Sequence, residues 1–148
     1  MQFFFNILII IFFIINTSTA YSQSRELKAE YTKTNRFFKD KNFTKALKSN
    51  ERALKLSIKE FGKEHLTTAT LYENKGRLLI ELESFLEAEN VLREVVEIRN
   101  KLISDYNPEL AEAINYLALS LRKQNKLEKV MIEHNKVLKI MGNIIANN

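Results

Sequence analysis

Few residues in this 148-residue chain are of the types that carry enzyme chemistry. The chain has no cysteine and two histidines, His65 and His134, which lie far apart in the sequence. Without cysteine there is no thiolate nucleophile, no disulfide, and no Cys-ligated zinc or iron–sulfur site. Two histidines alone are also too few ligands for a structural zinc site. We therefore expect no catalytic residue, no metal ion and no bound cofactor.

A group of acidic residues could in principle attract a cation. Glu81, Glu83, Glu87 and Glu89 lie close together in the sequence. They lack the alternating oxygen ligands and the glycine of a calcium-binding loop, so we interpret them as a solvated surface. The sequence also has no phosphate-binding loop, dinucleotide fingerprint or G-x-S-x-G nucleophile motif. It predicts a protein that is not an enzyme.

The first twenty residues differ in composition from the rest of the chain. Every Lys, Arg, Asp and Glu lies after Ser24, and residues 3–15 are apolar except for one asparagine. This run is shorter than the about 20 residues that a helix needs to span a bilayer, and small residues follow it, as at a signal-peptide cleavage site. We expect residues 1–20 to be a signal peptide and residues 21–148 to be secreted or periplasmic. Because no Lys or Arg precedes the run, an uncleaved membrane anchor and a buried N-terminal element are alternatives.

The rest of the chain repeats with a period of 42 residues. Phe43 aligns with Phe85 and then Leu127, and Ala46 aligns with Ala88, with no insertion or deletion. Within each unit, apolar residues recur three to four positions apart, which is the spacing of one helix face, and polar turns interrupt the pattern. No segment alternates with the period of a strand. We predict six helices, over residues 24–40, 43–61, 66–82, 85–103, 108–123 and 127–145.

The residues between the units are typical helix ends. Gly62 can adopt the left-handed conformation that ends a helix, and Asn107 followed by Pro108 suits the start of one. His65 aligns with Asn107, so we expect it to cap or pack this loop. His134 falls near the buried stripe of the last helix, where we expect it to be partly buried beside a hydrogen-bonding neighbour.

These units resemble tetratricopeptide repeats, specifically the 42-residue variety of kinesin light chains. The likeness is carried by a small residue in the first helix, an aromatic at the turn and an alanine in the second helix, which are Gly76, Phe85 and Ala88 in the middle unit. Thr34 in the first unit and Val130 in the third depart from this pattern. The resemblance implies an all-α, right-handed α-solenoid of about three helix-turn-helix repeats. The repeats would cover about 25–61, 66–103 and 108–145 within a domain of residues 21–148.

In the resembled family, the first helices of successive units line a concave groove that binds peptides. The resemblance therefore implies a non-enzymatic protein–protein interaction module with a peptide or protein partner. Asparagine side chains can both donate to and accept from a peptide backbone, and arginine can bind a carboxylate through two N–H groups. The groove residues that the resemblance implies are Lys28, Tyr31, Asn35, Phe38, Glu73, Asn74, Arg77, Asn115, Leu119 and Arg122.

Charge and the C-terminal sequence suggest what else the module could bind. The formal net charge is +5 overall and +6 for residues 25–61, which could steer an acidic partner. We expect no nucleic acid, because no nucleic-acid-binding motif is present and an export signal is, and membrane contact only through residues 3–15. The apolar C-terminal helix suggests homo-oligomers as an alternative function, namely a self-associating scaffold. A further alternative is a sensor or regulatory fragment of a larger signalling protein.

Overall fold

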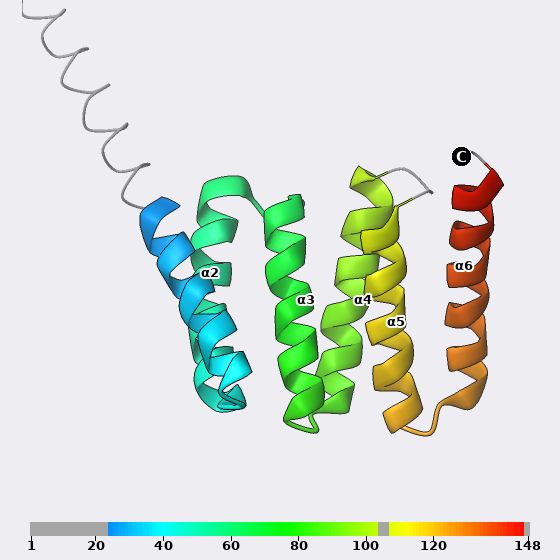
Figure 1. The fold of residues 1–148 in the computed structure, drawn as a ribbon, viewed down its shortest axis with the longest axis horizontal. Helices are drawn as coiled ribbons and strands as arrows, with labels where there is room; N and C mark the ends of the chain where they lie inside the picture. Colours follow the sequence, from blue (N-terminus) through cyan, green and yellow to red (C-terminus); the bar gives the residue numbers. More distant parts are fainter. Residues whose placement is uncertain (1–23, 104–106, 147–148) are drawn as a thin grey trace, which may run out of the picture.

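The computed structural model describes residues 24–103 and 107–146, and this part of the chain is entirely helical apart from its turns. The helices agree with the predicted bounds to within one residue. Figure 1 shows them standing side by side. They are a first helix over residues 24–39, then α2 (Phe43–Phe61), α3 (Leu66–Glu81), α4 (Phe85–Leu102), α5 (Pro108–Lys123) and α6 (Leu127–Ala146).

The predicted signal peptide lies outside the described residues. Among the helices that the structure describes, none has an apolar stretch long enough to cross a membrane.

Consecutive helices pack as hairpins, and the hairpins stack into an extended array. Each helix from α2 to α5 packs against the next one along the chain, and α3 also contacts α5. The first helix overlaps α2, and α5 overlaps α4, when the molecule is viewed as in Figure 1. The array therefore has two layers, with the first helix, α3 and α5 in one and α2, α4 and α6 in the other.

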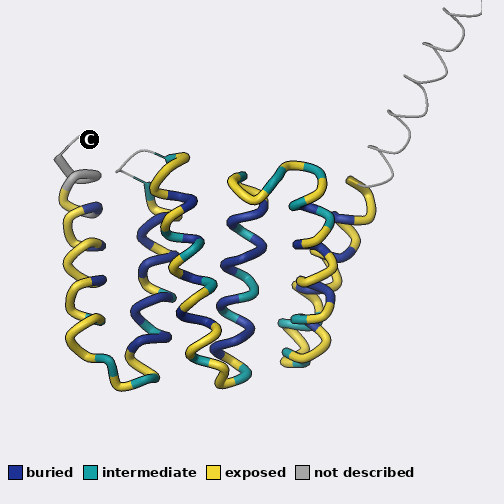
Figure 2. Tube along the Cα trace, turned by 180° about the vertical axis from the view of Figure 1, so that it is seen from behind, coloured by how far each residue is buried: buried dark blue, intermediate teal, exposed yellow. Residues whose placement is uncertain are grey.

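Apolar side chains of both layers form three core clusters, and the partly buried Val96 packs against all of them. Leu71 and Leu78 of α3, Leu92 of α4, and Leu117 and Leu121 of α5 are almost completely buried. Burial of a side chain of this size contributes about 1.5–3 kcal/mol to folding. Figure 2 shows buried residues along the inner faces of the central helices, whereas most of α6 is exposed. The core is thus centred on the middle unit.

Each unit has the same turn between its two helices. Lys41, Glu83 and Asn125 have positive φ angles of 55°, 59° and 60°, and they are spaced by the 42-residue period. The next residue in each turn donates its backbone N–H to a carbonyl five residues earlier, for example Ser84 N to Leu79 O at 2.8 Å. This is the hydrogen-bond pattern of a Schellman motif, which satisfies carbonyl groups at a helix end. The backbone conformation therefore follows the sequence repeat.

The predicted caps between the units are confirmed. Gly62 has a φ of 87°, and its N–H donates to Ile58 O. Asn107 caps α5, because its Oδ1 accepts from the N–H of Glu109 at 2.8 Å, and Pro108 is the first helical residue. These residues set where α2 ends and where α5 begins.

Gly76 of α3 lies against α4. A Cβ atom at Gly76 would lie 2.6 Å from Cγ of Leu92, a distance that real Cβ contacts do not reach. The small residue predicted at this position therefore allows the two helices of the middle unit to approach closely. Thr34 occupies the equivalent place in the first unit, where it is buried and donates its hydroxyl to Glu30 O at 2.9 Å.

Candidate functional site

Arg77 of α3 lies at the centre of the layer formed by the first helix, α3 and α5. Its guanidinium carbon lies 5.3 Å from the ring centroid of Phe38 on the first helix and 4.9 Å from that of Tyr116 on α5. Arg77 thus joins all three helices of the layer. Stacking of this kind uses the faces of a guanidinium group and leaves its N–H groups, which lie in the plane of the group, available as donors.

A cleft of about 200 Å³ opens between the first helix and α3 beside Arg77. Four of the predicted groove residues line it, namely Asn35, Phe38, Asn74 and Arg77. Within the described part of the chain, the buried Nδ2 of Asn74 has no hydrogen-bond partner. An unsatisfied buried donor costs about 1–3 kcal/mol, so a ligand carbonyl that accepts from it would remove that cost. The cleft therefore offers a cationic group and an amide donor side by side.

The remaining predicted residues lie elsewhere on the same layer. Lys28 and Tyr31 line a second, more apolar cleft of about 520 Å³ near the start of α3. On α5, Asn115 and Arg122 are exposed, and Leu119 is half-buried against the core. The structure therefore brings together the central members of the predicted set and separates the outer ones from them.

Glu73 is buried beneath this surface, where its carboxylate forms an ion pair with Arg99 of α4. Arg99 Nη1 donates to Glu73 Oε2 and also to the backbone carbonyl of Glu109 at 2.6 Å. Burial raises the pKa of Glu73, the charge of Arg99 opposes the rise, and Glu112 adds to it. Glu73 thus ties α3 to α4 and to the start of α5, and it is not placed to contact a partner.

The two histidines have different surroundings. His65 is the N-cap of α3, where its Nδ1 accepts from the N–H of Thr67 at 3.1 Å and its ring stacks on Phe61 at 4.6 Å. Its predicted capping role is confirmed. His134 is exposed on α6, so the prediction of a partly buried side chain was wrong. No group of three or more His, Cys, Asp or Glu side chains in the described ranges is arranged to hold a metal ion.

The interpretation of the four acidic residues as a solvated surface was wrong for Glu89, which is buried, whereas Glu81, Glu83 and Glu87 are exposed. Glu89 of α4 accepts from Arg93 at 2.9 Å, Lys126 at 2.6 Å and Gln124 at 3.0 Å. Burial alone would raise the pKa of Glu89, but these hydrogen bonds together lower it to about 2. Lys126 and Gln124 lie 37 and 35 residues along the chain from Glu89, so no local pattern signals the network. We interpret it as a structural connection between α4 and the turn after α5.

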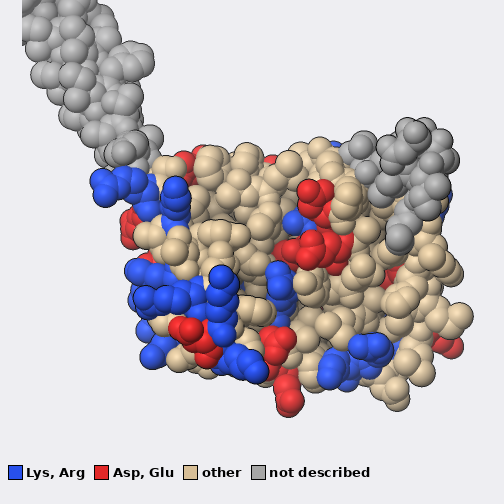
Figure 3. Space-filling view, in the orientation of Figure 1, with Lys and Arg blue, Asp and Glu red and all other residues tan. Residues whose placement is uncertain are grey.

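Charge is unevenly distributed over the surface of this layer. Figure 3 shows Lys and Arg side chains gathered over the first helix and an acidic cluster farther along the array. The basic end agrees with the net charge of +6 for residues 25–61. A charged peptide lying along this layer would therefore meet a basic first unit and then an acidic cluster, which favours one orientation.

Comparisons with known proteins agree with this architecture. A family model described as tetratricopeptide repeat matches residues 37–101, from the end of the first helix to the last turn of α4. BtubC (BKLC) from P. vanneervenii is similar in structure over 79% of this chain, with a TM-score of 0.74 and 21% identity. The fold is that of tetratricopeptide repeats.

Two more solved structures show the same tetratricopeptide-like fold. A Podosopora anserina protein with nearly identical TPR-like repeats of kinesin-light-chain type matches 81% of this chain, with a TM-score of 0.72 and 18% identity. The N-terminal domain of stress-induced protein-1 from C. elegans matches 80% of this chain and 86% of its own length, with a TM-score of 0.65 and 24% identity.

The chain spans 46% of BtubC and 56% of the Podosopora protein, about half of each. No curated protein sequence matches this chain. Tetratricopeptide repeats in general present extended concave surfaces that bind other proteins.

Proposed function

We propose that this chain is an exported, non-enzymatic interaction module that binds a peptide segment of a protein partner. The binding surface would be the layer formed by the first helix, α3 and α5. The observation that carries this proposal is the position of Arg77, held between Phe38 and Tyr116 beside the unsatisfied amide of Asn74. Those two groups provide donors at a fixed place on this surface.

The peptide would carry a carboxylate and lie extended across the helices. Arg77 would bind the carboxylate, and Asn74 would donate to a backbone carbonyl one or two residues away. The basic first unit would attract an acidic segment during encounter, an effect that salt weakens. Asn35, Lys28 and Tyr31 would contact the partner toward one end, and Asn115 and Arg122 toward the other.

A displayed peptide library tests this proposal without knowledge of the natural partner. Peptides selected on the full chain should be enriched in acidic residues and should bind at least about tenfold more weakly to Arg77→Ala, because one charge-assisted hydrogen bond contributes about 1.5–3 kcal/mol. Asn74→Ala should weaken binding by a smaller factor, because a neutral hydrogen bond contributes about 0.5–1.5 kcal/mol. Arg77→Lys should rescue little, since lysine lacks the planar pair of N–H groups.

Lys55→Ala is the matched control, because it removes one positive charge from an exposed site on α2, in the other layer. Thermal unfolding of each variant shows whether it is still folded. If peptide binding is as sensitive to Lys55→Ala as to Arg77→Ala, the peptide is held by net charge and the proposed surface is wrong.

Export is proposed from the composition of residues 1–20 alone. The test is expression of the full chain in a secreting host, followed by mass spectrometry of the product. Cleavage after Ala20 would leave a product that starts at Tyr21 in the extracytoplasmic fraction. An intact product in the membrane fraction would instead support an uncleaved anchor, and an intact product in the cytoplasm would contradict export.

Self-association is a second candidate function, because α6 presents a large apolar surface. Leu127, Met131, Ile132 and Leu138 are each more than half exposed. Apolar side chains gathered on one helix mark an interaction surface more often than scattered ones do. A second copy of the chain could cover them, which would make the protein a self-associating scaffold.

A further inference from the structure

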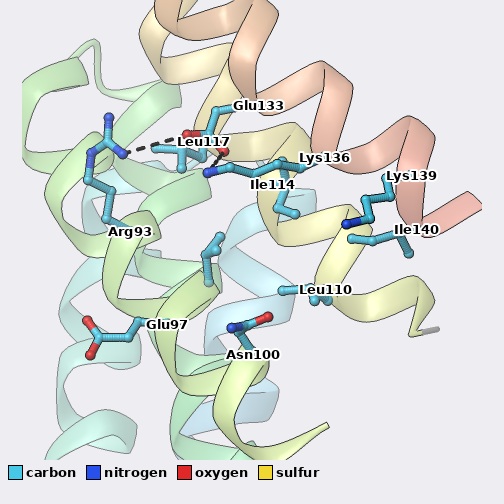
Figure 4. A pocket seen from close by; sticks show the side chains of 11 residues that line it. Arg93, Glu97, Asn100, Leu110, Ile114, Leu117, Glu133, Lys136, Lys139 and Ile140 are labelled. Atoms are coloured by element: carbon cyan, nitrogen blue, oxygen red, sulfur yellow. Dashed lines mark ion pairs between the residues drawn. The ribbon is translucent and has the colours of Figure 1, made fainter. Parts of the chain in front are cut away.

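A second cleft, of about 400 Å³, lies between α4 and α6 with α5 as its floor. It shares no lining residue with the cleft beside Arg77. Its floor is formed by apolar side chains, and charged groups stand around its rim, as Figure 4 shows. The floor consists of Val96, Leu110, Ile114, Leu117 and Ile140, and the rim of Arg93, Glu97, Asn100, Glu133, Lys136 and Lys139.

The repeat explains why this interface is open. One unit earlier, the position of Ile114 is occupied by Tyr72, which is 8% exposed and packs in a cluster with Leu54, Val95 and Ile98. Isoleucine is smaller than tyrosine, and Ile114 borders the cleft. The chain therefore fills this space at one interface and leaves it open at the next.

The rim has also changed its charge between the two interfaces. Arg93, Lys136 and Lys139 stand at the positions that Glu51, Glu94 and Glu97 occupy one unit earlier. Three acidic positions have thus become three basic ones. Two acidic side chains, Glu97 and Glu133, also stand in the rim, so its cations exceed its anions by one. This excess of positive charge suits a negatively charged group.

The cations of the rim differ in how far they are neutralised. Glu133 is buried and lies 3.7 Å from Arg93 and 2.9 Å from Lys136. Within the described ranges, Lys139 makes no hydrogen bond or ion pair. Figure 4 shows its side chain extending from α6 toward the cleft, and Asn100 on the α4 side. A positive charge without a partner therefore stands above an apolar floor.

We propose that this cleft binds an aliphatic carboxylate with a single medium-length chain. The chain would lie in the cleft against the partly exposed Val96 of α4 and against Ile140 of α6, and the carboxylate would accept from Lys139 and Asn100. The volume is at the small end of the about 300–1,000 Å³ range of ligand pockets, so it suits one medium-length chain and not a two-chain lipid. Neither the apolar floor nor the charged rim alone selects this ligand, but together they do.

Isothermal titration of the full chain with sodium decanoate tests this proposal, with decyltrimethylammonium as the cationic counterpart. We expect saturable one-to-one binding of decanoate and much weaker binding of the cation. Lys139→Glu should weaken decanoate binding by at least about tenfold, because it replaces an attractive charge by a repulsive one. Lys129→Glu makes the same charge change on α6 outside the cleft, so it should leave binding unchanged.

Ile114→Tyr provides a second, steric test, because it copies the residue that fills the preceding interface. It should abolish decanoate binding while circular dichroism and thermal unfolding show an intact fold. If that variant fails to fold, Lys139→Glu decides alone, since the residue is exposed. Any decanoate that binds to the apolar residues 3–15 does so equally in every variant, so this binding cancels when variants are compared. The proposal is overturned if decanoate does not saturate, if both amphiphiles bind equally, or if a folded Ile114→Tyr still binds.

Discussion

Gly76 shows how one residue sets the distance between two helices. Its Cα faces Leu92, which is completely buried, and an added Cβ would lie 2.6 Å from Leu92 Cγ. Alanine favours a helix by about 1 kcal/mol over glycine, but overpacking a core typically costs about 1–3 kcal/mol. We expect Gly76→Ala to lower the free energy of unfolding by about 1 kcal/mol, as measured by urea denaturation.

Gly142 of α6 is the matched control for this substitution. A Cβ at Gly142 would have no atom within 4 Å, so Gly142→Ala should show the gain in helix propensity without the clash. The two substitutions should therefore change the free energy of unfolding in opposite directions. If Gly76→Ala stabilises the protein as much as Gly142→Ala does, the close approach of α3 and α4 does not constrain the fold.

Glu89 makes the stability of the folded protein depend on pH in the acid range. Its pKa is lowered to about 2 in the folded protein, from an ordinary value of 4.5, so its contribution is complete above pH 4.5 and is lost as the pH falls toward 2. We expect Glu89→Gln to reduce the free energy of unfolding by about 2 kcal/mol at pH 7, and by progressively less between pH 4.5 and pH 2.

Urea denaturation of wild type and variant at several pH values measures this difference. Glu128→Gln, which makes the same change at an exposed glutamate of α6, is the control. A gap between Glu89→Gln and wild type that stays constant from pH 7 to pH 2 would argue against a lowered pKa in the folded state.

At the scale of elements, the turns inside the first two units use a conformation that Lys41 and Glu83 do not favour. Glu83 has a φ of 59°, which costs an L-residue about 1 kcal/mol or more and costs glycine almost nothing. Glu83→Gly should therefore raise the free energy of unfolding by about 0.5–1 kcal/mol, even though glycine also makes the unfolded chain more flexible.

Thermal unfolding of Glu83→Gly beside Ser84→Gly measures this effect. Ser84 has a φ of −84°, so glycine brings no conformational relief there and should be neutral or destabilising. Equal effects of the two substitutions would mean that the positive φ of Glu83 carries no strain.

The sequence predicts the elements well because they depend on local patterns. Helix bounds follow from the 3.6-residue periodicity and from caps such as Asn107, and both are visible in the sequence alone. The positions of buried charged groups depend on partners far along the chain. The resemblance therefore placed Glu73 among the groove residues, although its ion pair with Arg99, 26 residues along the chain, keeps it buried.

His134 illustrates a second limit of prediction from a repeat. Its equivalents Asn50 and Leu92 are completely buried, because a following unit covers them. Among the described residues, no helix covers that side of α6, so the same position is exposed. Alignment between repeats transfers the local pattern but not the neighbour that buries it. The cleft that Ile114 lines was missed for the same reason, since its shape depends on how α4, α5 and α6 pack together.

At the scale of the whole molecule, the two ends of the described array differ in polarity. On the first helix, Glu26, Lys33 and Arg36 are exposed at positions where α5 buries Leu110, Leu117 and Ser120. On α6, by contrast, Leu138 is 66% exposed, whereas the equivalent Leu54 of α2 is 8% exposed. The outward face of the first helix is therefore polar, whereas α6 exposes apolar side chains at the other end of the array. Copies would therefore not stack head to tail, because charged groups would be buried against leucine and methionine.

A twofold pair through α6 avoids that cost, since each apolar surface then covers the other. We expect the mass of the full chain, measured by light scattering, to rise from monomer toward dimer with concentration. Met131→Lys together with Leu138→Lys should abolish the rise, because each places a charge in the contact. Leu86→Lys changes an equally exposed leucine, 64% exposed, on α4 and should leave the dimer intact. If all variants and the wild type rise alike, the association comes from another part of the chain, and if none rises, α6 does not mediate self-association.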